Sequence, residues 1–489
     1  MNRRTLLKRG AALLGASALG GFTLPANSGL SHAASEQVFT SVLPIPPLLR
    51  STGGGDGIRH FNLSAERGEM PFFPGTTTPT MGYNGSYLGP TIKVRDGEKI
   101  NIQFTNNLGQ RTSLHWHGLH VPARWDGGPR QEVAAGAVWN PEFTVKQCAA
   151  TLWYHPHAMG LTGEHVYLGL AGLFVVEDEV SDNLDIPKTY GIDDFPIVLQ
   201  DRRFFNDGRF AYAQSMMDVM HGVIGNYLLV NGSLQPNLDV ARSLVRLRIL
   251  NGSNSSIYRV SFSDNRAFHQ IATDGGFQET PVRLDNLILS AGERAEILVD
   301  FGGDPDGTQL TLHVEQVVGG SFEAMQFTVL PQRGEPYRVP ERLAKIDWIP
   351  EEAAAQTRTF SLQTMSRGMG MMRRGGRLTI NGRNMDLTFV NEKVKLGTAE
   401  IWEIENRSTM MMQLPHSMHL HDVQFQILDR NGRKPEPREA GRKDTVLLLP
   451  GDRTRVIARF DDYTGIYMYH CHLLEHEDNG MMGQFEVVG

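Results

Sequence analysis

Ten of the 17 histidines lie in four short clusters whose spacing is typical of metal ligands. Each cluster contains a His-x-His pair, and in an extended strand residues i and i+2 point to the same face about 6.6–6.8 Å apart. One pair can therefore bind a single metal ion or bridge two neighbouring ions. The eight paired histidines are His115, His117, His155, His157, His419, His421, His470 and His472.

The number of pairs favours copper over the alternatives. A single pair could be an ordinary surface or core feature, but four pairs in one chain are too many for that interpretation. Structural zinc sites close with four ligands and are often rich in cysteine, and hydrolytic zinc sites use three histidines or a carboxylate. Neither kind of zinc site needs eight imidazoles, whereas imidazole nitrogen is well suited to copper.

Cys471 lies between His470 and His472, so strand alternation places its side chain on the opposite face. One strand is therefore predicted to serve two metal sites. Two histidines, one thiolate and a weak axial methionine make a blue-copper electron-transfer site. The other candidate ligands near Cys471 are His416, His476 and Met481. A free buried thiol is the alternative, and it leaves this spacing unexplained.

Short strands are predicted to position these side chains, and the strands belong to a threefold repeat. Asn-Gly turns recur at Asn84, Asn231 and Asn381, at separations of 147 and 150 residues. Runs such as residues 244–249 alternate apolar and polar side chains, which predicts strands with one buried face. Frequent Gly, Pro and Asn between the runs favour an all-β fold of three Greek-key β-sandwich or barrel domains.

A second self-similarity relates the two ends of the chain. Residues 152–157 (LWYHPH) parallel residues 467–472 (YMYHCH), whereas the middle repeat has no His-x-His pair and is predicted to be a structural spacer. Linkers rich in proline and charge suggest boundaries near 180–195 and 335–357. The predicted domains are residues 38–180, 195–335 and 357–489.

The amino terminus resembles a twin-arginine signal peptide over residues 1–33. Arg3 and Arg4 precede an apolar run at 11–24, and small residues allow cleavage after Ala33. A membrane anchor is the alternative, but the run is shorter than the ~20 residues that span a bilayer. The mature protein is therefore expected to be periplasmic or secreted, with no membrane span.

Length and charge exclude other classes. The chain has 489 residues, which suggests about three domains. Its net charge of −7 does not favour nucleic acid as a partner. With only two cysteines and Cys471 committed to metal, no disulfide is predicted, and Cys148 is expected to be a small buried side chain. We expect a monomer.

The four His-x-His motifs and the His-Cys-His…His…Met signature closely resemble the multicopper oxidases, the family of laccases, bilirubin oxidases and bacterial copper-efflux oxidases. The resemblance extends from about residue 80 to the end of the chain. It implies three cupredoxin domains and four copper ions, one of type 1, one of type 2 and two of type 3. By resemblance, type 1 copper takes His416, Cys471, His476 and Met481, type 2 takes His115 and His419, and the type 3 pair takes His117, His155, His157, His421, His470 and His472.

The resemblance also implies a laccase-like activity. Phenols, aromatic amines or cuprous ion would each give one electron, which would pass from Cys471 to the adjoining His470 and His472, and dioxygen would be reduced to water. An axial Met481 favours a lower potential and easily oxidised donors. Asp126 and Glu477 occupy positions where related oxidases place proton donors, although either could be a solvated loop acid.

Several alternatives differ from a general laccase. A dedicated periplasmic cuprous oxidase would serve copper tolerance and copper homeostasis, and a non-catalytic copper-binding protein would need no link from Cys471 to its neighbours. A copper nitrite reductase would not need four His-x-His pairs, and a cell-division or assembly scaffold of this fold usually lacks the ligands.

A short methionine segment bears on the choice of substrate, because thioethers bind cuprous ion. Its candidate ligands for substrate copper are Met365, Met369, Met371 and Met372. Four nearby arginines disfavour a cation, and Met412 and Leu414 stand where copper-efflux oxidases offer an Asp and a Met. Flexible packing is the alternative role of the segment.

Overall fold

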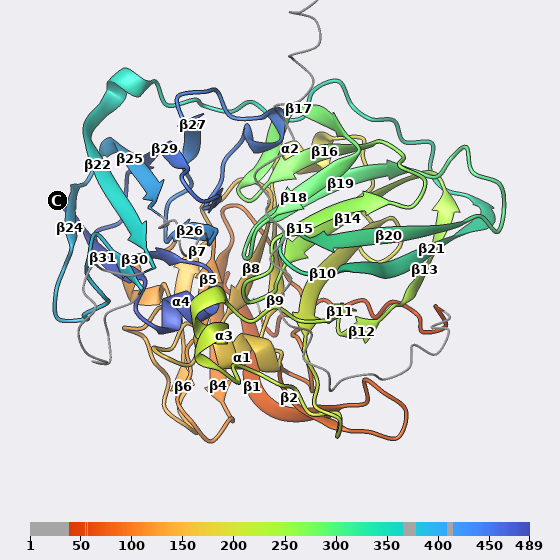
Figure 1. Ribbon diagram of the computed structural model, residues 1–489. Coiled ribbons are helices and arrows are strands. Elements are labelled where there is room, and N and C mark those ends of the chain that lie inside the picture. Colours follow the sequence, from red (N-terminus) through yellow and green to blue (C-terminus); the bar gives the residue numbers. More distant parts are fainter. Residues whose placement is uncertain (1–38, 54, 56, 365–377, 408–413) are drawn as a thin grey trace, which may run out of the picture. The chain divides into compact units, whose positions relative to one another are not determined.

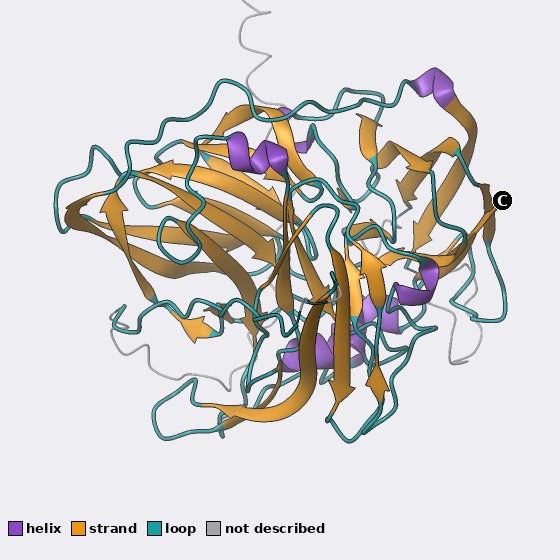
Figure 2. Ribbon diagram, turned by 180° about the vertical axis from the view of Figure 1, so that it is seen from behind, coloured by secondary structure: helices purple, strands orange, loops and turns teal. Residues whose placement is uncertain are grey.

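The computed structural model describes residues 39–53, 55, 57–364, 378–407 and 414–489. The predicted signal peptide and the methionine segment, including Met365, Met369, Met371 and Met372, lie outside these described residues, as does Met412. The predicted all-β fold is confirmed, because six sheets account for nearly all regular structure (Figures 1 and 2). No helix among the described residues is both long and apolar enough to cross a membrane.

The first two sheets come from the amino-terminal third of the chain. One contains β1 (Arg59–Met70), β2 (Thr78–Tyr83), β4 (Lys99–Asn106), β6 (Val138–Trp139) and β7 (Glu142–Thr144). The other has the order β3 (Ile92–Arg95), β9 (Gly172–Glu177), β8 (Ala150–His155) and β5 (His115–His117). Their alternating strands enclose an apolar core that includes Ile100, Ile102 and Phe104. Burial of such a core is the main stabilising contribution to each sheet pair.

The middle third forms a seven-stranded sheet and a five-stranded sheet. The first has the order β12 (Ser233–Leu234), β11 (Tyr227–Val230), β10 (Asp194–Arg202), β14 (Leu244–Asn251), β19 (Arg294–Asp300), β16 (Phe268–Thr273) and β17 (Gly276–Leu284). The second has the order β13 (Asn237–Arg242), β21 (Ser321–Arg333), β20 (Gln309–Gln316), β15 (Tyr258–Phe262) and β18 (Asn286–Leu289).

The last third repeats the arrangement. One sheet has the order β23 (Thr379–Ile380), β22 (Ala354–Gln363), β25 (Thr398–Asn406), β29 (Arg453–Phe460) and β27 (Gln426–Arg430). The other has the order β24 (Glu392–Lys395), β31 (Met482–Val488), β30 (Gly465–Cys471), β26 (His416–Leu420) and β28 (Thr445–Leu448). Every sheet draws its strands from one third of the chain, while residues 38–489 form a single compact unit. The boundaries near 180–195 and 335–357 stay predictions.

The Asn-Gly turns have the same hydrogen bonds in all three thirds. Asn84, Asn231 and Asn381 adopt φ values of 52°, 50° and 52°, in the left-handed region that asparagine tolerates. Each side-chain oxygen accepts a backbone N–H bond of 2.7 Å from a preceding strand, and the donors are Ser64, Val198 and Ser361. The repeat read from the sequence is therefore a repeat of structure.

Strand β14 differs from its prediction. Alternation in residues 244–249 predicted one solvent-facing side, but every residue of β14 is buried. Arg246 and Arg248 are buried because they pair with carboxylates: Arg248 Nε lies 2.8 Å from Asp194 Oδ1, and Arg246 Nε lies 2.9 Å from Glu296 Oε2. A polar residue at alternate positions thus marks a buried ion pair here instead of solvent.

The expectation for Cys148 is wrong, because its side chain is exposed. It precedes β8 in an extended segment in which Val145, Gln147 and Ala149 point inward. Alternation therefore turns Lys146 and Cys148 toward solvent.

The described residues also form a few short helices and turns. They are α1 (Thr162–Leu168), α2 (Glu179–Asn183), α3 (Met216–His221), α4 (Leu474–Asp478) and the 3₁₀ turns η1 (Ala123–Trp125), η2 (Glu351–Ala353) and η3 (Pro437–Glu439). Helices α1, α3 and α4 come from different thirds and lie together (Figure 1).

Candidate metal centre

Two pairs of antiparallel strands bring the histidine clusters together. Strand β5 pairs with β8 so that His115 lies opposite His155, and β26 pairs with β30 so that His419 lies opposite His470. All ten histidines of the clusters are buried. Each cluster sits on or just beyond one of these four strands. Sheet pairing sets which histidines meet within the first and within the last third, and the packing of these two thirds brings their clusters together.

The first group of imidazoles contains His157, His421 and His470. Their Nε2 atoms lie 3.1–3.2 Å from one another, at the corners of a nearly equilateral triangle. Each Nδ1 atom lies next to a carboxylate oxygen, which leaves the Nε2 lone pairs directed at one another. Buried imidazole nitrogens that converge in this way could hold a metal ion between them.

A second group contains His117, His155 and His472. The Nδ1 atom of His117 lies 3.4 Å from the Nε2 atom of His155. The ring of His472 approaches both, with ring centroids 4.8 Å from that of His117 and 5.4 Å from that of His155.

The remaining paired histidines, His115 and His419, lie edge to face with ring centroids 5.9 Å apart. The Nε2 atom of each is buried without a hydrogen-bond partner among the described residues. Buried polar atoms are rarely left without a partner, so this pair also fits a metal ion. Burial lowers the pKa of both imidazoles, which keeps them neutral and able to donate a lone pair.

Cys471 belongs to a separate group on the other face of β30. Its Sγ atom lies 3.4 Å from His416 Nδ1 and 3.6 Å from His476 Nδ1. Met481 is buried in the same apolar core. Burial raises the pKa of the Cys471 thiol to about 12, so a bound cation is needed to hold the thiolate.

Backbone hydrogen bonds hold the loop that supplies the ligands after β30. The Cys471 N–H donates to the Met481 carbonyl at 3.0 Å, and the Met481 N–H donates to the His476 carbonyl at 2.9 Å. The Nε2 atom of His476 lies 3.0 Å from the Met220 carbonyl of α3. This contact leaves Nδ1 of His476 to face the sulfur.

The two predicted carboxylates both lie against histidines. Asp126 follows η1, and its Oδ2 atom accepts a hydrogen bond of 2.8 Å from His421 Nδ1. Glu477 of α4 places its two oxygens 3.2 Å from His157 Nδ1 and 3.1 Å from His470 Nδ1. Burial raises the pKa of Asp126 to about 6, although His115 and His470 act to lower it.

Sequence reasoning missed three supporting residues. Asp444 accepts from a ring nitrogen of His117, Glu475 anchors α4 to the middle third, and Met220 contacts His476 through its carbonyl. None of them lies in a motif. No local pattern in the sequence marks any of the three.

Comparisons with known proteins agree with this geometry. Sequence models described as multicopper oxidase match residues 65–181 and 354–489. The chain is 35% identical over 446 residues to the multicopper oxidase mco of Staphylococcus aureus, covering 91% of this chain and 92% of that one. It is also 35% identical over 471 residues to the cell division protein FtsP of Salmonella typhimurium, covering 94% of both.

A solved structure is similar over most of the fold. The laccase-like multi-copper oxidase CueO from the lignin-degrading bacterium Ochrobactrum sp. is 36% identical, with a TM-score of 0.83 over 91% of this chain and all of that one. The three sheet pairs are therefore cupredoxin-like β domains, and the histidine groups could hold the metal that the name of this family implies. On this evidence the chain belongs to the multicopper oxidase family.

Proposed function

We propose that this protein is a laccase-type oxidase that couples one-electron oxidation of small donors to the four-electron reduction of dioxygen to water. The observation that carries the proposal is the separation of Cys471 from its two neighbours: its sulfur joins one ligand group, while His470 and His472 join two others. An oxidase needs this connection, and a copper store does not.

The proposed arrangement has four copper ions. His416, Cys471, His476 and Met481 would hold one ion, and His115 and His419 a second. The groups His157, His421, His470 and His117, His155, His472 would hold one ion each. Bound copper supplies reversible one-electron chemistry, so four stored electrons can reduce one dioxygen molecule fully.

The protein contributes the path and the protons. Cys471 is covalently joined through its backbone to His470 and His472, which gives electrons a short route between the two faces of β30. The eight paired histidines, from His115 to His472, form the eight-histidine cluster. Asp126 and Glu477 contact imidazoles of this cluster and could deliver protons there. The burial of all these side chains excludes bulk water from the ligand groups.

The donor is proposed as a class: electron-rich phenols, aromatic amines or cuprous ion. A role as a dedicated cuprous oxidase in copper tolerance is the second candidate, favoured by the methionine segment at 365–372. The proposed location is the periplasm or the exterior, reached by the twin-arginine route. Replacing Met365, Met369, Met371 and Met372 with leucine should reduce turnover of cuprous ion, but not of a phenol, if that segment binds substrate. If the segment only packs, the change should not separate the two activities.

The direct test is copper content, visible spectrum and oxygen uptake of the copper-loaded protein with a phenol and with cuprous ion. We expect four copper ions per chain, an intense thiolate absorption band and water as the product. His157→Ala should lose copper, whereas His165→Ala should retain it. His165 is an equally buried histidine that contacts Gln110 and Thr112 instead of a ligand group.

Absence of copper uptake and oxygen consumption in the wild-type protein would contradict the oxidase. That result would favour a role other than oxidation, such as the cell division named for the FtsP relative.

A further inference from the structure

His117 is oriented differently from the other histidines of the eight-histidine cluster. Six of those histidines place Nδ1 against an oxygen and leave Nε2 facing the ligand groups. The backbone carbonyl oxygens of Asp126, Pro156 and Asp444 lie against His115, His155 and His419, respectively. The carboxylate oxygens Glu477 Oε1, Asp126 Oδ2 and Glu477 Oε2 lie against His157, His421 and His470, respectively. His117 instead places Nε2 against an oxygen, 3.0 Å from Asp444 Oδ1, and turns Nδ1 toward His155.

The carboxylate of Asp444 is itself held in one orientation. Arg294 donates to both oxygens, with Nη1 2.7 Å from Oδ1 and Nη2 2.6 Å from Oδ2. The hydroxyl of Thr445 donates to Oδ1 at 2.9 Å. All three side chains are fully buried. A bidentate arginine fixes the plane of a carboxylate as well as its position, so Oδ1 cannot turn away from His117.

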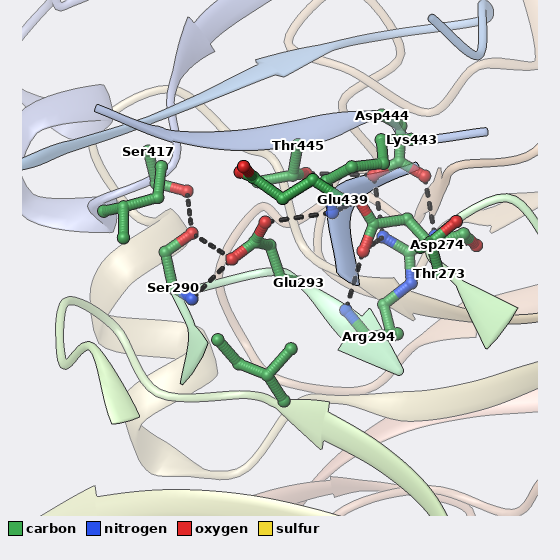
Figure 3. Close-up of polar contacts among 12 residues, drawn as sticks. Thr273, Asp274, Ser290, Glu293, Arg294, Ser417, Glu439, Lys443, Asp444 and Thr445 are labelled. Atoms are coloured by element: carbon green, nitrogen blue, oxygen red, sulfur yellow. Dashed lines mark hydrogen bonds and ion pairs between the residues drawn. The ribbon is translucent and has the colours of Figure 1, made fainter. Parts of the chain in front are cut away.

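Arg294 comes from β19 of the middle third, and further buried charges of that third surround it (Figure 3). Its Nη2 atom also donates to the Asp274 carbonyl at 2.9 Å, and the Asp274 carboxylate lies 2.7 Å from Lys443 Nζ. Lys443 lies 3.0 Å from Glu293 as well. The result is one connected network between the middle and last thirds that ends at a histidine of the cluster.

We propose that Asp444, held by Arg294, is a positioning residue that keeps His117 protonated at Nε2 so that Nδ1 faces the metal. A neutral imidazole carries one N–H, and the hydrogen bond made by one ring nitrogen selects the atom left for a metal. The middle third, predicted to be a spacer, thereby supplies a group that acts on the eight-histidine cluster. The inference rests on the proposed function only for the identity of the metal.

A purely structural ion pair is the competing explanation, and the chain contains one for comparison. Arg248 and Asp194 are equally buried and lie 2.8 Å apart in the same sheet as Arg294. Arg248 also donates to Glu296 and Thr151. Among the described residues, neither Arg248 nor Asp194 contacts a histidine of the cluster. The two pairs therefore separate loss of a buried ion pair from loss of the contact with His117.

The first measurement needs no change to the network. In the copper-free wild-type protein, labelled with ¹⁵N at histidine, nitrogen chemical shifts report which ring nitrogen carries the proton. The signals of His117 are assigned by their loss in His117→Gln. We expect His117 to carry its proton on Nε2, in contrast to His115, His155 and His419. A proton on Nδ1 of His117 would overturn the proposal.

The second measurement compares two double variants that replace an ion pair by apolar side chains of similar shape. Asp444→Leu with Arg294→Met should mix the two tautomers of His117 and weaken copper binding by about 10–100-fold, the usual effect of losing such a partner. Asp194→Leu with Arg248→Met should lower the melting temperature comparably and change neither the tautomers nor the copper content.

Equal copper affinity and an unchanged His117 tautomer in the first double variant would reduce Asp444 to a structural role and refute the proposal. If that variant does not fold, the wild-type tautomer measurement still decides the matter. Failure of the wild-type protein to bind copper would contradict the proposed function and leave the tautomer result standing.

Discussion

The two faces of β30 differ in the partners that they offer to their ligands. On the sulfur face, the outer ring nitrogens of His416 and His476 lie near neutral oxygens, the Thr364 hydroxyl at 3.4 Å and the Met220 carbonyl at 3.0 Å. On the imidazole face, three carboxylates contact the rings, from Asp126, Glu477 and Asp444.

This difference matches two kinds of chemistry. Transfer of an electron needs a rigid ligand set but no proton, and neutral backbone and hydroxyl oxygens hold a ring without adding a titrating group. The proposed reduction of dioxygen to water would consume protons, and the buried carboxylates next to the imidazoles could hold them. The faces of a single strand are thus specialised by what packs behind each ligand.

Helix α4 links the two environments through consecutive residues. Glu475 accepts hydrogen bonds from Asn254 and Ser255 of the middle third, His476 joins the sulfur group, and Glu477 lies against the imidazole cluster. A helix turn of 3.6 residues sends neighbouring side chains in different directions. Five residues are therefore enough to serve an anchor and both sites.

Removing the sulfur should give the largest effect. Cys471→Ser deletes the thiolate from one face and leaves all eight imidazoles of the other. We expect loss of the intense visible band and a fall in turnover of at least about 100-fold, beyond what loss of an outer partner costs. Copper content measured by elemental analysis should fall by no more than one ion per chain. Cys148→Ser, at the exposed cysteine, is the control.

If Cys471→Ser removed copper from the imidazole face as well, the two faces would not be independent.

A smaller effect is expected from the carboxylates of the imidazole face. Asp126→Asn keeps an oxygen that can accept from His421 but cannot donate a proton. Copper content and the visible band should stay, while reoxidation of the reduced protein by dioxygen slows by about 10–100-fold. Stopped-flow absorbance measures this rate. Asp201→Asn changes an equally buried carboxylate of the middle third and serves as the control. Unaltered reoxidation in Asp126→Asn would remove this carboxylate from proton delivery.

The gathering of the candidate ligands into groups was predictable from the sequence, and most of the residues that support them were not. A His-x-His pair and its central cysteine are read from the two-residue period of one strand, which needs no knowledge of the rest of the fold. Asp444 and Met220 meet their histidines through the packing of distant strands and helices, which leaves no local pattern.

The errors have the same origin. Alternation correctly predicted that β14 is a strand but not that Arg248 would be buried, because its partner Asp194 lies 54 residues away. The prediction for Cys148 followed the general tendency of cysteine toward burial, but the alternation of its segment places the side chain in solvent.

Loss of the anchor on α4 should change stability more than chemistry. The Glu475 carboxylate accepts from Asn254, Ser255 and the Val223 N–H. Glu475→Gln presents an amide N–H₂ to one of these donors, so we expect a loss of about 1–3 kcal/mol in the free energy of unfolding. Chemical denaturation of the copper-free protein measures it, with Glu164→Gln on the exposed face of α1 as the control.

A stability unchanged from that of Glu164→Gln would show that α4 does not depend on the middle third.

The smallest effect is expected at His120, which joins the first and last thirds outside both ligand faces. Its ring lies 2.8 Å from Asp422 Oδ1 and 2.6 Å from Asp462 Oδ1. Burial would lower the pKa of His120, but hydrogen bonds and charge from the two carboxylates raise it to about 9. Because the folded-state pKa exceeds the ordinary value of 6.5, the stabilisation is complete below pH 6.5 and disappears as the pH rises through 9.

The shift corresponds to at most about 3 kcal/mol, and the exposure of Asp462 reduces this to about 1–2 kcal/mol. His120→Gln should remove that part of the pH dependence between pH 6.5 and 9, as measured by chemical denaturation of copper-free protein, in which metal binding cannot contribute. His313→Gln on β20 controls for loss of a histidine elsewhere. If the wild type and His120→Gln lose stability in parallel over this range, the ion pair does not link the two thirds, and the pH response must arise from other titratable groups.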